Sequence, residues 1–320
     1  MTDEPQGRRW RAEQIPFHLI TGMLGAGKTT LLRNLIRHRP AGERWAVLVN
    51  EFGDAGFDGD WLRGCGVPVR EVQGGCMGCT AAVTLRVELN RLLREARPDR
   101  LLIEPTGLGH PAELLRLLRA EHYQGVLTPA AHLCLIDPRR LREPRFAASP
   151  LWPAQLDAAD LVVGSKQDLW DTQAEADFEA LRQRWPGARY TRCGPDGLDS
   201  AWLALPPSAG AAEPACEHGH AHGHAHGHAG LADWQAFSWY PPADWCIDEA
   251  ALRRALAGWD WERIKGTLAA PGGGWRLDAV AGDIGLTPLP EATENRLQVI
   301  CPAATDAAGF REALLEAGSS

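Results

Sequence analysis

The apolar positions alternate between two kinds of pattern up to about residue 205. Short, nearly continuous apolar runs bounded by turn residues are typical of strands buried on both faces, and they occupy positions 15–22, 45–50, 99–107, 132–138 and 160–168. Other segments carry apolar residues at the 3.6-residue spacing of a helix, namely 28–38, 84–97, 111–122 and 172–185. Strands that alternate with helices predict an α/β fold with a mostly parallel sheet covered by helices.

The pattern changes beyond this region. Residues 209–230 are rich in Ala, Gly, Pro and His, and such a composition cannot build an apolar core. After them, strand patterns and helices near 248–258 and at the C-terminus predict a compact α+β unit. We therefore expect a disordered N-terminus (1–14), an α/β domain (15–208), a linker (209–230) and a smaller α+β domain (231–320).

Composition narrows the class of protein. The chain of 320 residues is 45% hydrophobic and 23% charged, as in ordinary globular proteins. Its net charge of −8 argues against a dedicated nucleic-acid binder, because neutralising phosphates needs a basic surface. The first residues lack the apolar core of a signal peptide, and no run is long enough to span a membrane. We expect a cytoplasmic protein with mostly reduced cysteines and no nucleic-acid or membrane partner.

Lysine is rare in this chain. Among 33 basic residues only Lys28, Lys166 and Lys265 are lysines. Each lysine marks a position where the bulky, planar guanidinium of arginine is not an equivalent substitute for the compact ammonium of lysine. Lys28 and Lys166 fall in the two motifs described below, "GMLGAGKT" and "SKQD", whereas the sequence assigns no role to Lys265.

The segment after the first predicted strand has the phosphate-binding pattern G-x4-G-K-[ST], from Gly22 to Thr29. Its glycines let backbone N–H groups point at phosphate oxygens, and the following helix adds its positive end. Lys28 is expected to act on the β- and γ-phosphates, and Thr29 to ligate Mg²⁺. The first domain is therefore predicted to be a P-loop NTPase domain. The residues expected to bind the nucleotide here are Gly22, Gly25, Ala26, Gly27, Lys28, Thr29 and Thr30.

Two acidic segments could complete the chemistry. "IEPTG" ends a predicted strand, so Glu104 is expected near the Mg²⁺ shell and Gly107 near the γ-phosphate. The acidic segment "NEFGDAGFDGD" offers Asp54, and also Asp58, for Mg²⁺ or for positioning water, although an ordinary acidic turn explains either residue equally well. Glu104 and Asp54 are thus the catalytic candidates beside Lys28.

"SKQD" (165–168) follows another buried strand and resembles the guanine-reading motif N-K-x-D, with Ser165 in place of Asn. In that motif the carboxylate, here Asp168, accepts from guanine N1 and N2, and the Lys166 stem packs on the base. Adenine would leave this carboxylate facing an acceptor, without a hydrogen-bond partner. The sequence therefore favours GTP over ATP.

Cys76 and Cys79 stand three positions apart in the glycine-bordered segment "GGCMGCT". A redox dithiol normally belongs to a thioredoxin-like context, which a P-loop domain does not provide. A structural zinc site would need a second pair of ligands at suitable spacing, and none is apparent. A releasable metal site near the nucleotide is the favoured reading, with dithiol redox chemistry or no metal as the alternatives.

A histidine-rich tract carries imidazoles at every second position, which can bind Zn²⁺, Co²⁺ or Ni²⁺. The alternative is a solvated linker. We expect auxiliary metal binding, weaker than at the thiols because ordering a coil costs entropy. The histidines are His218, His220, His222, His224, His226 and His228.

Together these motifs resemble the CobW family of P-loop metallochaperone GTPases, and within it the YeiR-type zinc-binding GTPases. The resemblance rests on "TGMLGAGKTT", "WAVLVNEFGDAGFDGD", "GGCMGC", "PDRLLIEPTGLGHP", "LCLIDPR", "SKQD" and "ERIKG". It implies slow GTP hydrolysis and zinc-type binding at a cysteine motif near the nucleotide. The family motif is C-x-C-C, and the middle thiol is replaced here, which puts a three-thiolate site in doubt. The resemblance brings Glu51 near this loop as a further ligand, and a nearby spare thiol, Cys65, is a further hypothesis.

The sequence thus predicts a Mg²⁺-dependent GTPase that binds zinc or a similar ion and delivers it to a client protein. Two rivals are a P-loop ATP-dependent kinase or transferase and a non-catalytic metal-storage protein that uses the histidine tract. The client and any homo-oligomer are left open.

Overall fold

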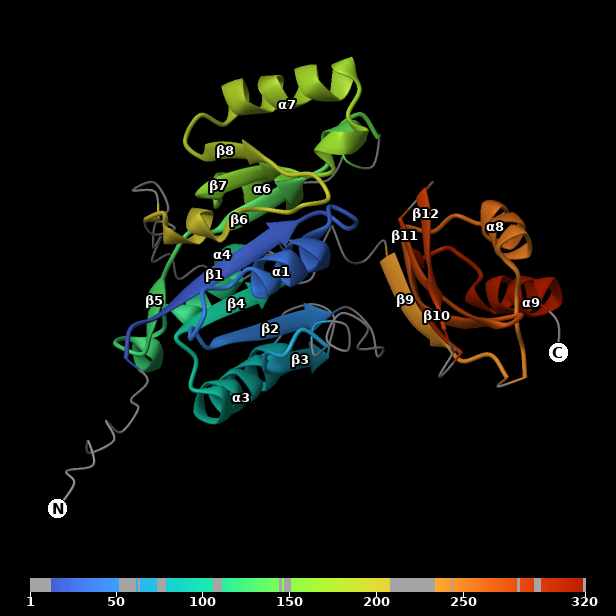
Figure 1. Ribbon diagram of the computed structural model, residues 1–320, viewed down its shortest axis with the longest axis horizontal. Helices are drawn as coiled ribbons and strands as arrows, with labels where there is room; N and C mark the ends of the chain where they lie inside the picture. Colours follow the sequence, from blue (N-terminus) through green and yellow to red (C-terminus); the bar gives the residue numbers. More distant parts are fainter. Residues whose placement is uncertain are drawn as a thin grey trace, which may run out of the picture.

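The computed structural model describes residues 13–51, 62, 64–73, 79–105, 111–143, 146, 151–207, 234–242, 244–280, 283–290 and 295–318. Within these residues the chain forms two separate sheets, each with its own helices (Figure 1). The expected linker (209–230) and residues 1–12 of the expected disordered N-terminus (1–14) lie outside this description, so the domain boundaries remain predictions. Of the last two residues of that N-terminus, Gln14 donates its N–H to the Gly125 carbonyl oxygen at 2.9 Å. None of the described helices is long and apolar enough to cross a membrane.

The first sheet has eight strands in the order β3-β2-β4-β1-β6-β7-β8, with β5 also paired to β1. Every pairing in it is parallel, which confirms the predicted α/β sheet. The strands are β1 (Ile15–Gly22), β2 (Trp45–Glu51), β3 (Val69–Gln73), β4 (Arg100–Glu104), β5 (Leu127–Pro129), β6 (Leu133–Ile136), β7 (Leu161–Gly164) and β8 (Arg189–Arg192).

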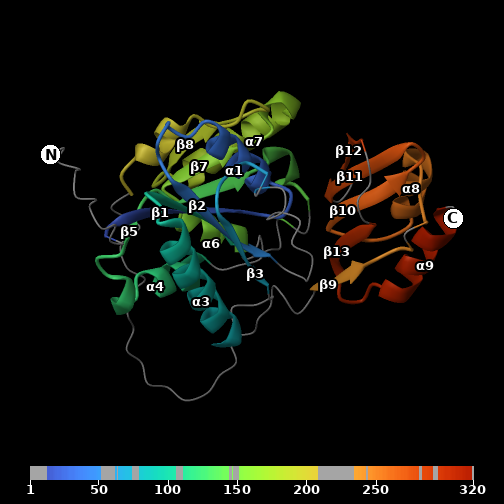
Figure 2. The same ribbon diagram turned by 60° about the horizontal axis from the view of Figure 1, so that its bottom comes forward.

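Helices cover both faces of this sheet (Figures 1 and 2). They are α1 (Lys28–Arg37), α3 (Cys79–Ala96), α4 (Pro111–Leu118), α6 (Leu151–Asp157) and α7 (Thr172–Arg184), with short 3-10 turns η1 (Glu121–Tyr123), η2 (Pro138–Arg140), η3 (Gln167–Leu169) and η4 (Ser200–Ala204). Helix α3 begins five residues before the predicted position 84, and α4 ends before the predicted 122 because a 3-10 turn follows it.

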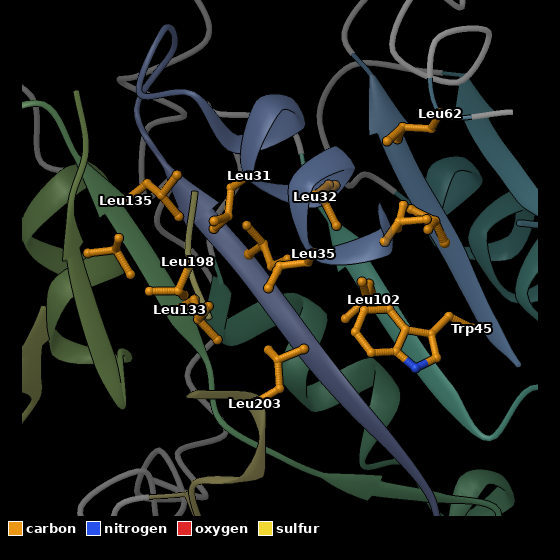
Figure 3. Packing of buried hydrophobic residues seen from close by; sticks show 14 of the residues in the cluster. Leu31, Leu32, Leu35, Trp45, Leu62, Leu102, Leu133, Leu135, Leu198 and Leu203 are labelled. Atoms are coloured by element: carbon orange, nitrogen blue, oxygen red, sulfur yellow. The ribbon is translucent and has the colours of Figure 1, made fainter. Parts of the chain in front are cut away.

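Each strand sends alternate side chains into different cores, because successive side chains point to opposite faces. In β4, Leu102 packs on the α1 side, whereas Leu101 and Ile103 pack on the side of α3 and α4. Figure 3 shows the α1 side, where Leu32 and Leu35 lie over the sheet. Because both faces are buried, the strands read as continuous apolar runs in the sequence.

The second sheet is antiparallel, in the order β12-β11-β10-β13-β9, and it carries α8 and α9. Its elements are β9 (Trp234–Trp239), α8 (Glu249–Ala257), β10 (Arg263–Ala270), β11 (Gly273–Val280), β12 (Asp283–Leu289), β13 (Arg296–Pro302) and α9 (Ala307–Ala317). Figures 1 and 2 show both helices on the side of this sheet that faces away from the first domain. The predicted smaller α+β unit is confirmed.

Candidate functional site

The candidate site lies at the edge of the first sheet where the parallel strands β1, β2, β3 and β4 all end. Strand β1 leads into the glycine-rich loop, β4 ends at Glu104, and β2 ends at Glu51. Strand β3 ends at Gln73, three residues before Cys76. Neighbouring strands are about 4.8 Å apart, so the end of β3, two places from β4, lies roughly 10 Å from it. This sheet edge therefore gathers the starts of the phosphate-binding, acidic and cysteine motifs, and the parallel strand β7 brings the base-reading segment to the same edge.

The glycine-rich loop needs its glycines for steric reasons. Gly22 has φ of +135°, and a Cβ there would lie 2.3 Å from the carbonyl oxygen of Leu135 in β6. Gly27 precedes α1 with φ of +93° and has no side chain to cap the helix. The N–H groups at the start of α1 are therefore oriented toward the loop without a side-chain acceptor, which is the arrangement that binds phosphate.

Lys28 is the first residue of α1 and is 3% exposed. Its ammonium donates to the carbonyl oxygens of Gly22, at 3.0 Å, and Met23, at 3.3 Å. These bonds hold the charge inside the curve of the loop. A phosphate bound by the loop would thus meet both the backbone N–H groups and this ammonium.

Thr29 and Glu104 contact each other directly. The Thr29 hydroxyl lies 3.2 and 3.3 Å from the two carboxylate oxygens of Glu104, and both residues are buried. Glu104 follows Leu102 by two positions in β4, so its side chain points to the same face, where α1 lies. The alternation of the strand thus brings together two residues that are 75 positions apart.

The predicted base-reading segment begins at the end of β7. Lys166 has a left-handed backbone, with φ of +55°, and its ammonium lies 3.4 Å from Asp137 Oδ2. Burial alone would raise the pKa of Asp137, but the hydrogen bond from Arg139 and the positive charge of Lys166 lower it below its usual value. Asp137 therefore remains ionised and orients the lysine stem. Ser165, at the position of the usual Asn, donates instead to the carbonyl oxygen of Ile136.

A pocket joins the base-reading segment to the glycine-rich loop. Asp168 is exposed at its rim and lies beside Gly194, where a Cβ would be 3.5 Å from Asp168 Oδ1. The pocket is lined by Ala26, Gly27, Thr30, Leu31, Asn34, Leu135, Ser165, Lys166, Asp168, Leu169, Cys193, Gly194, Pro195 and Gly197. Its lining therefore runs from the phosphate loop to the carboxylate of Asp168.

Sequence reasoning missed one wall of this pocket. The Cys193 carbonyl oxygen accepts from the Gln167 N–H at 3.1 Å, and Asn34 donates to the Pro195 carbonyl oxygen at 3.3 Å. The segment after β8 is therefore fixed to both the base-reading turn and α1. A glycine and a proline directly after a strand were the available signal.

Several predicted residues lie outside the described part of the chain. These are Asp54, Asp58, Cys76, Gly107 and the six histidines of the tract. Cys79 is the first residue of α3, and Glu51 the last of β2. Cys65 is half-buried against the α1-side core. In the described ranges, no three side chains of His, Cys, Asp or Glu gather into a metal-binding cluster.

Comparison with known proteins identifies the family. The CobW/HypB/UreG nucleotide-binding domain matches residues 16–189. The zinc chaperone YeiR of Escherichia coli (strain K12) is 36% identical over 317 residues, covering 93% of this chain and 97% of that protein. The zinc chaperone CobW of Sinorhizobium sp is 37% identical over 191 residues, covering 50% of this chain and 54% of that protein.

Among solved structures, the Zn(II)-bound YjiA GTPase from E. coli is 18% identical, with 94% of this chain and 98% of that chain covered and a TM-score of 0.44. The extent of the family match and the relative that spans nearly the whole chain decide the assignment. The chain belongs to the CobW/HypB/UreG family, and it is a GTPase.

Proposed function

We propose that this GTPase requires Mg²⁺, binds zinc at its cysteine motif and delivers the metal to a client protein. The observation that carries the proposal is topological. The glycine-rich loop, Glu104 and the strand that leads into the cysteine motif all stand at one edge of the first sheet. Nucleotide and metal would therefore act on neighbouring segments. The zinc chaperones among the relatives support zinc as the cargo.

The pair formed by Thr29 and Glu104 suits Mg²⁺. Both offer oxygen atoms, which this ion prefers, and both are buried beside the phosphate loop. Thr29 would bind the ion directly, while Glu104 would hold the hydroxyl or a water of the ion's shell in place. The ion would neutralise phosphate charge. Lys28 would act on the same phosphate oxygens from inside the loop, where its ammonium is already oriented by Gly22 and Met23.

The base pocket would select guanine. The Asp168 carboxylate would accept two hydrogen bonds from the guanine edge, while Lys166, oriented by Asp137, would pack on the ring. Gly107 and Asp54 would add the γ-phosphate contact and the positioning of water, as expected from the sequence.

Zinc would be held by Cys76 and Cys79, with Glu51 and Cys65 as further ligands and the histidine tract as an auxiliary store. Cys79 begins α3, and the start of a helix favours negative charge such as that of a metal-binding thiolate. GTP would order the segments at the sheet edge and thereby change zinc affinity. Linkage requires that zinc then changes GTP affinity by the same factor. Co²⁺ and Ni²⁺ are further candidate cargoes, and the cytoplasm is the proposed location.

Zinc is expected to change GTP hydrolysis by at least about fivefold, the lower end of typical coupling between two sites. The measurement compares kcat and KM for GTP in the purified full chain, with and without equimolar zinc. In the Cys76→Ser/Cys79→Ser variant the effect of zinc should disappear, while hydrolysis without zinc stays near the parent value.

Cys246→Ser is the matched control, because Cys246 is a half-buried cysteine of the C-terminal domain that forms no disulfide. This control should respond to zinc like the parent. Equal rates with and without zinc in the parent would remove the coupling, and the cysteine motif would then be a dithiol with another role. Unchanged zinc affinity in Cys65→Ser would exclude Cys65 as a ligand.

The Asp168→Asn variant is expected to raise KM for GTP by about 10- to 100-fold, since it weakens two hydrogen bonds to a charged acceptor. An amide can instead donate to the carbonyl oxygen that xanthine carries in place of the guanine amino group. The variant should therefore gain hydrolysis of XTP relative to GTP. Asp196→Asn, in the exposed loop after Pro195, is the control and should keep the parent's preference. An unaltered GTP-to-XTP ratio in Asp168→Asn would show that another group reads the base.

A further inference from the structure

The C-terminal domain contacts the glycine-rich loop itself. Met23 and Leu24 of this loop are buried in one apolar cluster with Phe146, Leu151 and Ile300. Ile300 belongs to β13, in the second sheet, and Ala236 of β9 packs on the same cluster. An apolar contact between the two domains thus includes the segment whose backbone would surround phosphate.

The strand pattern explains which face makes this contact. In β13, Leu297, Val299 and Cys301 point into the core under α8 and α9. Ile300 lies between them in sequence, so it points to the opposite face of the sheet. That face carries neither α8 nor α9 (Figures 1 and 2). The phosphate loop therefore packs on the face of the second sheet that α8 and α9 do not cover.

Gly25 gives a second, independent contact between the domains. A Cβ at Gly25 would lie 2.5 Å from both methyl carbons of Val280, the last residue of β11. The loop backbone is therefore pressed against a side chain of the C-terminal domain. A change in the path of the loop at this point must move Val280, or be opposed by it.

Arg140 adds a polar connection at the same place. Its Nη1 donates to the Leu24 carbonyl oxygen at 2.5 Å, and its Nη2 donates to Glu262 Oε1 at 3.1 Å. Glu143 accepts from Arg140 Nε and Nη2, both at 2.9 Å, which fixes the plane of the guanidinium. Arg140 and Glu262 are 6% and 4% exposed. Ion pairs excluded from water are screened little, so this one is sensitive to the loss of either partner.

We propose that Arg140 is a positioning residue of the phosphate-binding loop, and that through Glu262 the C-terminal domain sets the affinity of the loop for GTP. The guanidinium holds the Leu24 carbonyl, and Glu262 holds the guanidinium in the orientation that reaches it. Since the loop backbone would bind phosphate in the ground state and in the transition state alike, the effect falls on KM rather than on kcat. The inference rests on GTP hydrolysis and is independent of metal delivery.

The contact extends toward the base pocket. The pKa of Arg139 is raised first by its hydrogen bond with Asp137, with smaller contributions from Asp283 of β12 and from Asp168. Asp283 is thus near enough to act on the arginine that orients Asp137. The charge of the second sheet therefore also acts on an arginine next to the base-reading segment.

Glu262→Gln tests the proposal, because it removes one charge, keeps the shape and leaves Arg140 with Glu143. In the full chain without zinc, KM for GTP and the dissociation rate of a fluorescent GDP analogue should each rise about fivefold to tenfold, with kcat within about twofold. Arg140→Lys should behave similarly, since one ammonium cannot reach the Leu24 carbonyl, Glu143 and Glu262 together. The double variant should be no worse than Arg140→Lys alone, because the two residues act as one unit.

Asp278→Asn is the matched control. It removes a carboxylate whose 3.4 Å ion pair with Arg263 stays within the second sheet. Its KM and GDP release should match the parent. If Glu262→Gln lowers the thermal midpoint but leaves KM and GDP release at the control's values, the pair is purely structural and the proposal is wrong. Loss of zinc coupling would not change these constants, so a failure of the proposed metal function is distinguishable.

Discussion

Replacing Lys28 with methionine is expected to lower kcat/KM for GTP by about two to three orders of magnitude, the effect of removing one preorganised donor in an active site. Methionine has a similar volume and an apolar tip, so the site at 3% exposure stays filled. The carbonyl oxygens of Gly22 and Met23 lose the ammonium that opposes their partial negative charge. Phosphate would then face uncompensated acceptors as well as the missing cation.

Steady-state kinetics with GTP, together with thermal unfolding, measures this effect. Arg37→Met removes a positive charge from the exposed last turn of the same helix and should leave kcat/KM within about twofold of the parent, as surface substitutions usually do. Parent-like hydrolysis in Lys28→Met would mean that backbone N–H groups alone stabilise the transferred phosphoryl group.

Acid should destabilise this protein well before its carboxylates titrate. Burial lowers the pKa of His18 to about 4, with the nearby Arg100 acting in the same direction against a hydrogen bond to Ala131. Burial likewise lowers the pKa of His132 to about 4, against a hydrogen bond to Ala158 and the charge of Asp160. Both imidazoles are neutral in the folded protein, whereas the unfolded chain takes up protons below its ordinary value of 6.5.

The direction of the pH dependence follows from this difference between the folded and the unfolded pKa. Because the folded pKa is the lower one, the stabilisation is fully present above pH 6.5 and is lost as the pH falls toward 4. The two histidines together should reduce the free energy of unfolding by roughly 3–4 kcal/mol between pH 7 and pH 5. That is a large part of a typical domain stability of about 5–15 kcal/mol.

Urea unfolding at several pH values between 7 and 5 measures this loss. His18→Gln should remove about half of the pH dependence, since one of the two titrating groups is then absent. His122→Gln is the control, because His122 is exposed, and it should leave the pH dependence unchanged. If His18→Gln keeps the full slope, other groups carry the acid sensitivity.

The elements found from sequence are those whose signals are local. The glycine-rich loop combines a fixed spacing with a strand before it and a helix after it, so its position was predictable. Strands of the first sheet that are buried on both faces were predictable, because such strands are continuous apolar runs in the sequence. Strand β3 was not predicted, because it is a short edge strand that mixes valine with charged residues. Strand β12, another edge strand, contains Pro288 and Gly285, which weaken any strand pattern.

What sequence could not reveal is long-range placement. Thr29 and Glu104 were both expected near Mg²⁺, but their contact depends on the order of strands, which no local pattern encodes. Arg140 looked like one of many arginines, and two of its partners, Leu24 and Glu262, lie 116 and 122 positions away. The Cys193–Gly194 wall follows a strand whose side chains are only partly buried, so its apolar signal was weak. Non-local contacts of this kind are decided by packing, not by propensity.

The face of the second sheet that carries Ile300 and Val280 limits how freely the two halves of the chain can be recombined. This face is complementary to the phosphate loop of this chain, because Ile300 packs in one cluster with Leu24 and Val280 lies against Gly25. A chimera that joins this C-terminal domain to the nucleotide domain of a relative would have to transfer both sides of that contact. The C-terminal domain is therefore less an interchangeable module than an integral part of the nucleotide-binding half.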